Sequence, residues 1–307
     1  MKQKIALLSV ILASLLSACE PKPTPSDSES QAASEAMAEV KRVSLEGDTQ
    51  PLDLQLPTCQ ANNCPEIDIA RLSSNQAYVD QWVDAEILKV LQQILSIAPH
   101  PNSEPSKILP EHAASEAADQ AQLTTAKTSL EHQLQPYVKS FLYLDQELKD
   151  LSANHQISVL VKPRILNDQG PLATVVLNSS SYLGGAHGSS SQQYANFDLT
   201  QGKQILLKDI VLPKQQAALE KAAYAVFKAW VMESKLAENM RDYEQAWKFH
   251  LSENFYLSEQ GLVLQYAEYE IGPYVMGLPK LTLSYQDLDK ILKPEYLPVA
   301  ESAIKQP

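Results

Sequence analysis

The sequence predicts an α+β protein, with a mainly antiparallel sheet packed by helices and a helical insertion in the N-terminal half. Three observations support this. In the first half, apolar residues recur at helical spacing. After residue 155, short β-rich segments alternate with turn signals. Eight of the nine glycines follow residue 169, as a turn-rich sheet requires, and 307 residues are enough to bury a sizeable core.

The first eighteen residues predict a lipoprotein signal peptide. Lys2 and Lys4 precede an apolar run at residues 5–16, which is shorter than the roughly 20 residues that span a bilayer. The run leads into LSAC, which ends at Cys19 and resembles the bacterial lipobox. This resemblance implies that the chain is cleaved before Cys19 and that Cys19 is acylated. The acyl chains would then bind the protein to the lipid of the outer membrane. Glu20 follows, without the aspartate typical of inner-membrane retention, so we expect an outer-membrane protein on the periplasmic face or cell surface.

The two remaining cysteines, Cys59 and Cys64, predict a small disulfide loop. An exported protein meets an oxidising compartment, and a metal site would need more ligands than CQANNC supplies. The formal net charge of -12 disfavours nucleic acid and favours basic partners. A purely solubilising role for this charge is the alternative interpretation.

The N-terminal half predicts a tether followed by helices. Residues 19–48 are polar and favour a flexible tether behind the acylated cysteine. Residues 49–150 predict a mainly helical subdomain, in which residues 77–97 form an amphipathic helix. Residues 113–151 contain one proline, Pro136, which indicates either one long helix broken there or two helices.

Residues 151–307 predict an α+β domain. The β-rich segments are residues 157–161, 173–177, 194–199, 204–210, 255–257, 262–266 and 281–285. The turn residues 258–261 predict a hairpin of the two segments that flank them. The helical segments are residues 213–235 and 286–292. We expect no transmembrane helix, because no second apolar run reaches spanning length.

The stretch SYLGGAHGSSS, residues 181–191, concentrates three glycines around one histidine. Two interpretations stay open: the glycines supply the backbone freedom of a wide turn, or they let a partner approach the backbone. The candidate binding residues are Tyr182, Gly184, Gly185, His187 and Gly188.

Aromatic residues add further candidates. Three tyrosines lie near Gly272 and Pro273 in the sequence: Tyr266, Tyr269 and Tyr274. They are either interface anchors or part of the hydrophobic core. We take Tyr269 and Tyr274 as candidate binding residues. Two tryptophans in helical stretches, Trp230 and Trp247, are expected in the core.

Four stretches carry a resemblance to a known family: SYLGGAHG (181–188), NFDLTQGK running into LKD (196–209), NFYL with GLV (254–263) and YEIGPY (269–274). In this order they resemble the extracytoplasmic domain of RsiV-like proteins, which also occurs in PdaC-type deacetylases beside a separate catalytic domain. The resemblance covers residues 155–295. It implies an α+β extracytoplasmic domain whose partner is a lysozyme-type muramidase.

No pattern of catalytic residues accompanies this domain. The chain lacks a Gly-x-Ser-x-Gly elbow, and its six histidines show no metal-ligand spacing. We therefore expect that the protein is not an enzyme and that it binds neither a metal nor a cofactor. The function predicted is that of a non-enzymatic envelope lipoprotein that binds lysozyme or another basic protein. The alternative is a peptidoglycan-associated accessory factor or a cell-wall-modifying enzyme.

Overall fold

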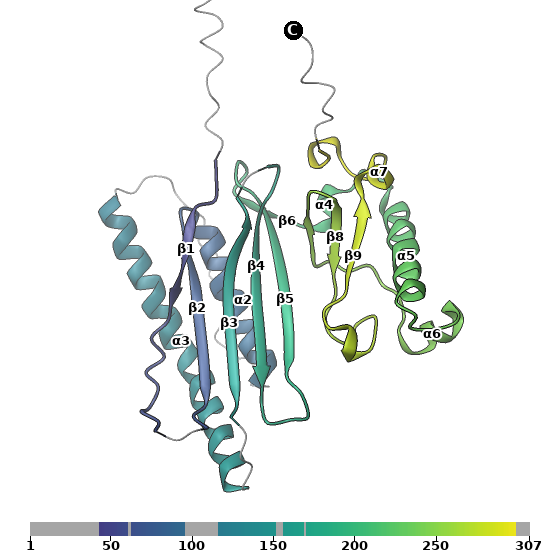
Figure 1. Cartoon of the computed structure of the whole chain (residues 1–307). Helices are drawn as coiled ribbons and strands as arrows, with labels where there is room; N and C mark the ends of the chain where they lie inside the picture. Colours follow the sequence, from purple (N-terminus) through teal and green to yellow (C-terminus); the bar gives the residue numbers. More distant parts are fainter. Residues whose placement is uncertain (1–42, 61–62, 96–115, 152–155, 169, 299–307) are drawn as a thin grey trace, which may run out of the picture. The chain divides into compact units, whose positions relative to one another are not determined.

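The computed structural model describes residues 43–60, 63–95, 116–151, 156–168 and 170–298, leaving aside the side chains of residues 116–124. Figure 1 shows these parts in colour. The expected signal peptide, Cys19 and most of the expected tether lie outside the described residues. In the described part of the chain, no helix has the length and hydropathy that crossing a membrane would need.

The elements confirm a mixed α+β protein. The first group is β1 (Gly47–Pro51), β2 (Glu66–Ser74), α2 (Ala77–Leu95), α3 (Glu116–Asp150), β3 (Ser158–Asn167), β4 (Ala173–Tyr182), β5 (Ser189–Asp198) and β6 (Lys203–Ile205). The second group is α4 (Leu207–Ile210), α5 (Gln216–Glu233), α6 (Met240–Ala246), β7 (Phe255–Leu257), β8 (Gly261–Gln265), β9 (Lys280–Ser284) and α7 (Tyr285–Leu288), with two 3-10 turns at Tyr274–Met276 and Pro294–Tyr296.

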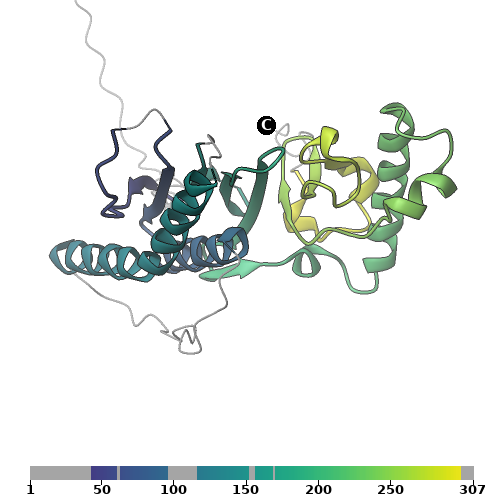
Figure 2. The same cartoon turned by 90° about the horizontal axis from the view of Figure 1, so that it is seen from below.

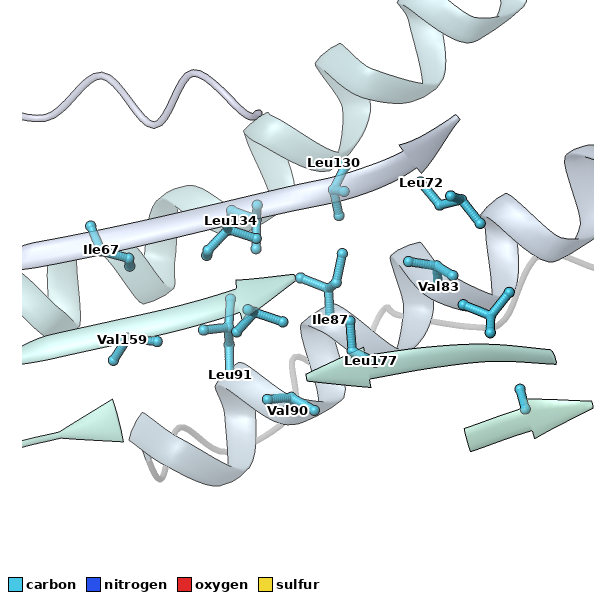
Figure 3. Packing of buried hydrophobic residues seen from close by; sticks show 14 of the residues in the cluster. Ile67, Leu72, Val83, Ile87, Val90, Leu91, Leu130, Leu134, Val159 and Leu177 are labelled. Atoms are coloured by element: carbon cyan, nitrogen blue, oxygen red, sulfur yellow. The ribbon is translucent and has the colours of Figure 1, made fainter. Parts of the chain in front are cut away.

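The first group forms a six-stranded sheet in the order β1-β2-β3-β4-β5-β6. Its neighbours are antiparallel except for β2 and β3, which run parallel and are joined through α2 and α3. Both helices lie on one face of this sheet (Figures 1 and 2). The predicted apolar stripe of α2 faces the sheet: Val83, Ile87 and Leu91 are fully buried and pack near Leu134 of α3 and Val159 of β3 (Figure 3).

Helix α3 resolves the alternative posed by Pro136, because one helix continues through this residue. Its side chains hold the segment that follows β1. Glu131 accepts a hydrogen bond from the backbone N–H of Asp53, at 2.8 Å, and Gln135 donates to the carbonyl of Leu54, at 3.3 Å.

The N-terminal part of the sheet differs from the sequence prediction in two respects. Strand β2 lies in a region expected to be mainly helical, and its parallel pairing with β3 carries the sheet across residue 150. Leu45 is buried and Glu46 bonds to Asn75, so the packed structure begins before the expected end of the tether at residue 48. The described residues all belong to one compact unit, which contains both hydrophobic cores.

The second group forms a three-stranded antiparallel sheet, β7-β8-β9, against which α5 packs (Figure 1). The predicted hairpin of β7 and β8 is confirmed. The predicted strand at residues 204–210 is wrong, because β6 ends at Ile205 and residues 207–210 form the helical turn α4. The Asp209 carboxylate accepts a hydrogen bond from the Leu206 N–H, at 2.9 Å, and so favours a helix start over a continued strand.

Two asparagine side chains connect the two sheets. Buried Asn196 of β5 donates to the Phe255 carbonyl, at 2.8 Å, and accepts from the Thr174 hydroxyl, at 2.9 Å. The Asn254 amide accepts from the Tyr194 N–H and donates to the Gln192 carbonyl, both at 2.8 Å. Asn254 thus takes the place of a neighbouring strand along the edge of β5.

Candidate functional site

The glycine-rich stretch forms the turn between β4 and β5. Gly184 has a φ of +82°, a conformation that side chains rarely adopt. A Cβ on Gly188 would lie 2.9 Å from the Ser181 carbonyl oxygen, whereas one on Gly185 would have its nearest atom at 3.9 Å. The backbone of the turn therefore requires two of the three glycines. This requirement agrees with the architectural interpretation of the loop.

The same turn brings His187 against aromatic residues from two distant segments. The His187 ring stacks on Tyr274, with ring centroids 4.0 Å apart and an interplanar angle of 21°. Tyr274 stacks on Tyr269 at 5.5 Å, and Tyr269 on Trp247 at 6.3 Å. We call these four residues, His187, Trp247, Tyr269 and Tyr274, the ring cluster. Their successive planes are inclined by 29° or less, so the rings lie nearly parallel.

Hydrogen bonds fix the orientation of three of these rings. The Tyr274 hydroxyl donates to the Gly188 carbonyl, at 2.9 Å. Nδ1 of His187 lies 3.3 Å from the same carbonyl oxygen, and Nε2 lies 3.3 Å from the Tyr269 hydroxyl. With the proton on Nδ1, His187 donates to Gly188 and accepts from Tyr269, which satisfies both contacts at once.

Tyr269 is an exposed member of the ring cluster and has an unusual backbone conformation. Its side chain is 50% exposed and its φ is +63°, in the left-handed region that residues other than glycine rarely occupy. Glu270, the next residue, holds this conformation. One oxygen of its carboxylate accepts a hydrogen bond from the Ala267 N–H, and the other lies 2.7 Å from Nε2 of His250. The surrounding structure thus keeps an exposed tyrosine in a strained position.

A second carboxylate attaches the same loop to the glycine-rich turn. Glu268 accepts from the Ser190 N–H and from the Ser189 hydroxyl, both at 3.1 Å. Residues 267–270 are therefore bonded directly to the start of β5. Both glutamates act in holding the loop, so their negative charge lies beside the ring cluster.

The structure brings together some of the predicted residues and not others. His187, Gly188, Tyr269 and Tyr274 meet in one place. Gly184 and Gly185 lie in the turn, and Tyr182 lies half-buried at the end of β4, opposite Ser158. Tyr266 is fully buried, with its hydroxyl donating to the His250 carbonyl, and burial raises the pKa of this hydroxyl.

Trp247, Glu268 and Glu270 are site residues that the sequence analysis did not identify. Trp247 was expected in the core. It follows α6, which ends at Ala246, as a half-buried residue that packs against the second core and also stacks on Tyr269. The YEIGPY motif gave the nearest signal, because Glu268 and Glu270 flank its first tyrosine.

The ring cluster offers aromatic surface to which another molecule can bind. Exposed aromatic rings attract cations and apolar groups. Among the residues that the structure describes, no group of three or more His, Cys, Asp or Glu side chains could hold a metal ion. Cys59 and Cys64 form a disulfide in the segment between β1 and β2, with Cα atoms 5.9 Å apart.

The fold and site thus define an α+β protein with a ring cluster at the junction of two sheets. Residues 208–286 match the family described as a protein of unknown function, DUF3298. This range contains Trp247, Tyr269 and Tyr274, whereas His187 precedes it. A search of curated proteins returned no significant match.

One solved structure shares the fold, and a second is reported beside it. A DUF3298 family protein from Pseudomonas aeruginosa PAO1 is 24% identical with a TM-score of 0.55, and the match covers 83% of this chain and 96% of that one. A member of the same family from Bacteroides fragilis NCTC 9343 is 18% identical with a TM-score of 0.49, covering 82% and 94%. These comparisons do not confirm the resemblance to RsiV-like proteins.

Proposed function

We propose that this protein is a non-enzymatic lipoprotein of the bacterial envelope that binds its ligand through the ring cluster. The observation that carries the proposal is the meeting of four aromatic rings from three separate segments, with Tyr269 held exposed in a strained backbone conformation. A fold keeps such strain where surrounding contacts over-determine it, and such positions cluster at functional sites. Acylated Cys19 would attach the domain to the outer membrane.

The partner that fits best is a basic protein of the lysozyme type. The chain carries a net charge of -12, which attracts a basic protein over distance. At contact, Lys and Arg side chains gain from aromatic faces such as that of Tyr269. The resemblance of residues 155–295 to RsiV-like proteins points to the same partner, with protection or sensing as the role.

The test is a titration of residues 43–307 against a c-type lysozyme at about 150 mM salt, where surface attraction is screened beyond about 8 Å. Tyr269→Ala and His187→Ala are compared with Tyr143→Ala, whose side chain on α3 is 67% exposed and lies outside the ring cluster. We expect micromolar or tighter binding that Tyr269→Ala weakens at least about thirtyfold, as a hot-spot residue would. Tyr143→Ala should leave binding unchanged.

Two outcomes would count against this proposal. Absence of lysozyme binding would remove the partner assignment. Binding that all three variants weaken equally, or not at all, would remove the ring cluster as its site.

Peptidoglycan is the second candidate ligand. The nearly parallel rings offer flat apolar faces, which suit sugar rings as well as basic side chains. Retention of the wild-type protein on purified sacculi, lost in Tyr269→Ala and kept in Tyr143→Ala, would favour this ligand. Release of soluble fragments from the sacculi would instead show that the protein is an enzyme.

A further inference from the structure

A second candidate site lies at the other end of β4 from the ring cluster. An open cavity of about 430 Å³ is bounded by the turn between β3 and β4, the turn between β7 and β8, and residues 294–298. Its walls are largely apolar or aromatic and include Leu166, Tyr256, Leu257, Tyr285, Tyr296 and Leu297. The volume falls within the range of about 300–1,000 Å³ that is usual for small-molecule sites.

Arg164 is a cation near this cavity that forms no ion pair with the described residues. Arg164 precedes the wall residue Leu166 by two positions on β3, just before the pairing of β3 with β4 becomes irregular between Ile165 and Asn167. Arg164 is exposed, and no carboxylate of the described residues lies within ion-pair distance of it, whereas Lys162 on the same face pairs with Asp68. The guanidinium group of Arg164 is therefore available to an anion.

A tyrosine pair connects Arg164 to the cavity wall. Register places Arg164 opposite Val176 and Val176 opposite Tyr194. The Tyr194 ring stacks on Tyr256, with centroids 4.4 Å apart, and Tyr256 lines the cavity. Burial raises the pKa of Tyr194 to about 12, and the positive charge of Arg164 acts in the opposite direction on this hydroxyl.

Negative charge lies at two places along the cavity: Glu259 of the turn between β7 and β8 is part of its lining, and three further carboxylates act on Tyr296. Burial and the carboxylates of Glu295, Asp198 and Asp209 raise the pKa of the Tyr296 hydroxyl. An anionic group would be repelled at Tyr296 and attracted at Arg164. A ligand with one anionic end is therefore expected to bind in a single orientation, with its anionic end at Arg164.

We propose that this cavity binds a small amphipathic carboxylate, with its apolar part between Leu166, Tyr256 and Leu297 and its carboxylate at Arg164. An arginine fork matches a carboxylate with two parallel hydrogen bonds. The apolar walls supply the remaining affinity. This site is independent of the ring cluster, because the two lie at opposite ends of β4, roughly 30 Å apart at about 3.4 Å per residue.

The test uses decanoate as the probe and decanol as the uncharged probe of the same chain length, each titrated into residues 43–307 by calorimetry. Arg164→Gln should weaken decanoate binding about tenfold and leave decanol unchanged. Lys162→Gln, on the same strand and face, is the matched control and should change neither. Leu166→Trp narrows the cavity at a residue that is 37% exposed, so it should weaken both probes without unfolding the protein.

Three outcomes would overturn the proposal. They are no binding of decanoate at about 1 mM, equal binding of decanoate by Arg164→Gln and wild type, or unchanged binding by a correctly folded Leu166→Trp variant. The decanoate titration is repeated with a fragment that ends at Pro298. If only that fragment bound decanoate, residues 299–307 would be the occupant of the cavity and the small-molecule assignment would fall.

Discussion

The rings of His187 and Tyr274 stack 4.0 Å apart, although one belongs to the turn between β4 and β5 and the other to a 3-10 turn before β9. The Tyr274 hydroxyl also bonds to Gly188, the residue after His187. The glycine-rich turn is therefore both an architectural element and one wall of an exposed aromatic surface. The two interpretations that the sequence left open are compatible.

The glycines of this turn should differ in their tolerance of a methyl group. Gly188→Ala places a Cβ 2.9 Å from the backbone oxygen of Ser181, so the turn must shift. We expect a loss of about 1–3 kcal/mol in the free energy of unfolding, together with altered Trp247 fluorescence. Gly185→Ala has room and should stay within about 0.5 kcal/mol of wild type. Urea denaturation measures both, and equal losses would contradict the geometry.

The Asn254 amide should be needed for the edge of β5. Asn254→Ala removes the partners of the Tyr194 N–H and the Gln192 carbonyl and should cost about 1–3 kcal/mol. Asn254→Asp keeps the acceptor, loses the donor and brings a negative charge to a carbonyl, so it should be no more stable than the alanine variant. Hydrogen exchange at Tyr194 should accelerate in Asn254→Ala. Unchanged exchange there would show that Asn254 does not protect this edge.

Removing one partner of the buried ion pair between β2 and α2 should lower the free energy of unfolding. Arg71 is 1% exposed and donates through Nε and Nη2 to the two oxygens of Asp84, at 3.1 and 2.8 Å. Asp84→Ala would leave an uncompensated buried guanidinium and should destabilise by about 3–5 kcal/mol. The double variant Arg71→Met, Asp84→Leu should recover much of this loss in urea denaturation. A double variant as unstable as Asp84→Ala would contradict this explanation.

Asp80 should make stability depend on pH. Burial raises the pKa of its carboxyl from the ordinary 3.8 to about 6, despite hydrogen bonds from the Ser74 N–H and hydroxyl. The folded protein therefore holds this proton more tightly than the unfolded chain does. Stability from this group is present near pH 4 and falls as pH rises towards 6 and above.

Replacement of Asp80 by asparagine isolates this effect. The unfolding free energy of Asp80→Asn relative to wild type should rise by about 2–3 kcal/mol between pH 4 and pH 7, at about 1.4 kcal/mol per unit of pKa shift. Thermal denaturation at both pH values gives the comparison. Asp287→Asn, at an exposed helix start, is the control. A pH-independent difference for Asp80→Asn would show that Asp80 is not the titrating group.

Several elements followed from local sequence patterns. The helical i, i+4 spacing of Val79, Val83 and Ile87 predicted α2, and all three are fully buried. The turn residues 258–261 predicted the hairpin of β7 and β8. Such elements need only their own residues to bury one face or to close a turn.

Other features depend on distant partners. Strand β2 exists because β3 pairs with it in parallel after two intervening helices, a relationship that no local pattern contains. Helix α4 replaced a predicted strand because Asp209 caps its first turn. Leu45 is buried because β1 pairs with β2, although its neighbours in sequence are polar.

The sequence by itself determined the α+β class, the core stripe of α2 and the glycine-rich turn, because each rests on residue type and short-range spacing. Only the tertiary structure decided which aromatic residues form the ring cluster. Tyr266 and Tyr269 are three residues apart, yet one is buried and the other exposed, because Tyr266 continues from β8 into the core and the left-handed backbone of Tyr269 turns its ring outward. The pairing of His187 with that ring required the two sheets to meet, which burial and the amides of Asn196 and Asn254 achieve.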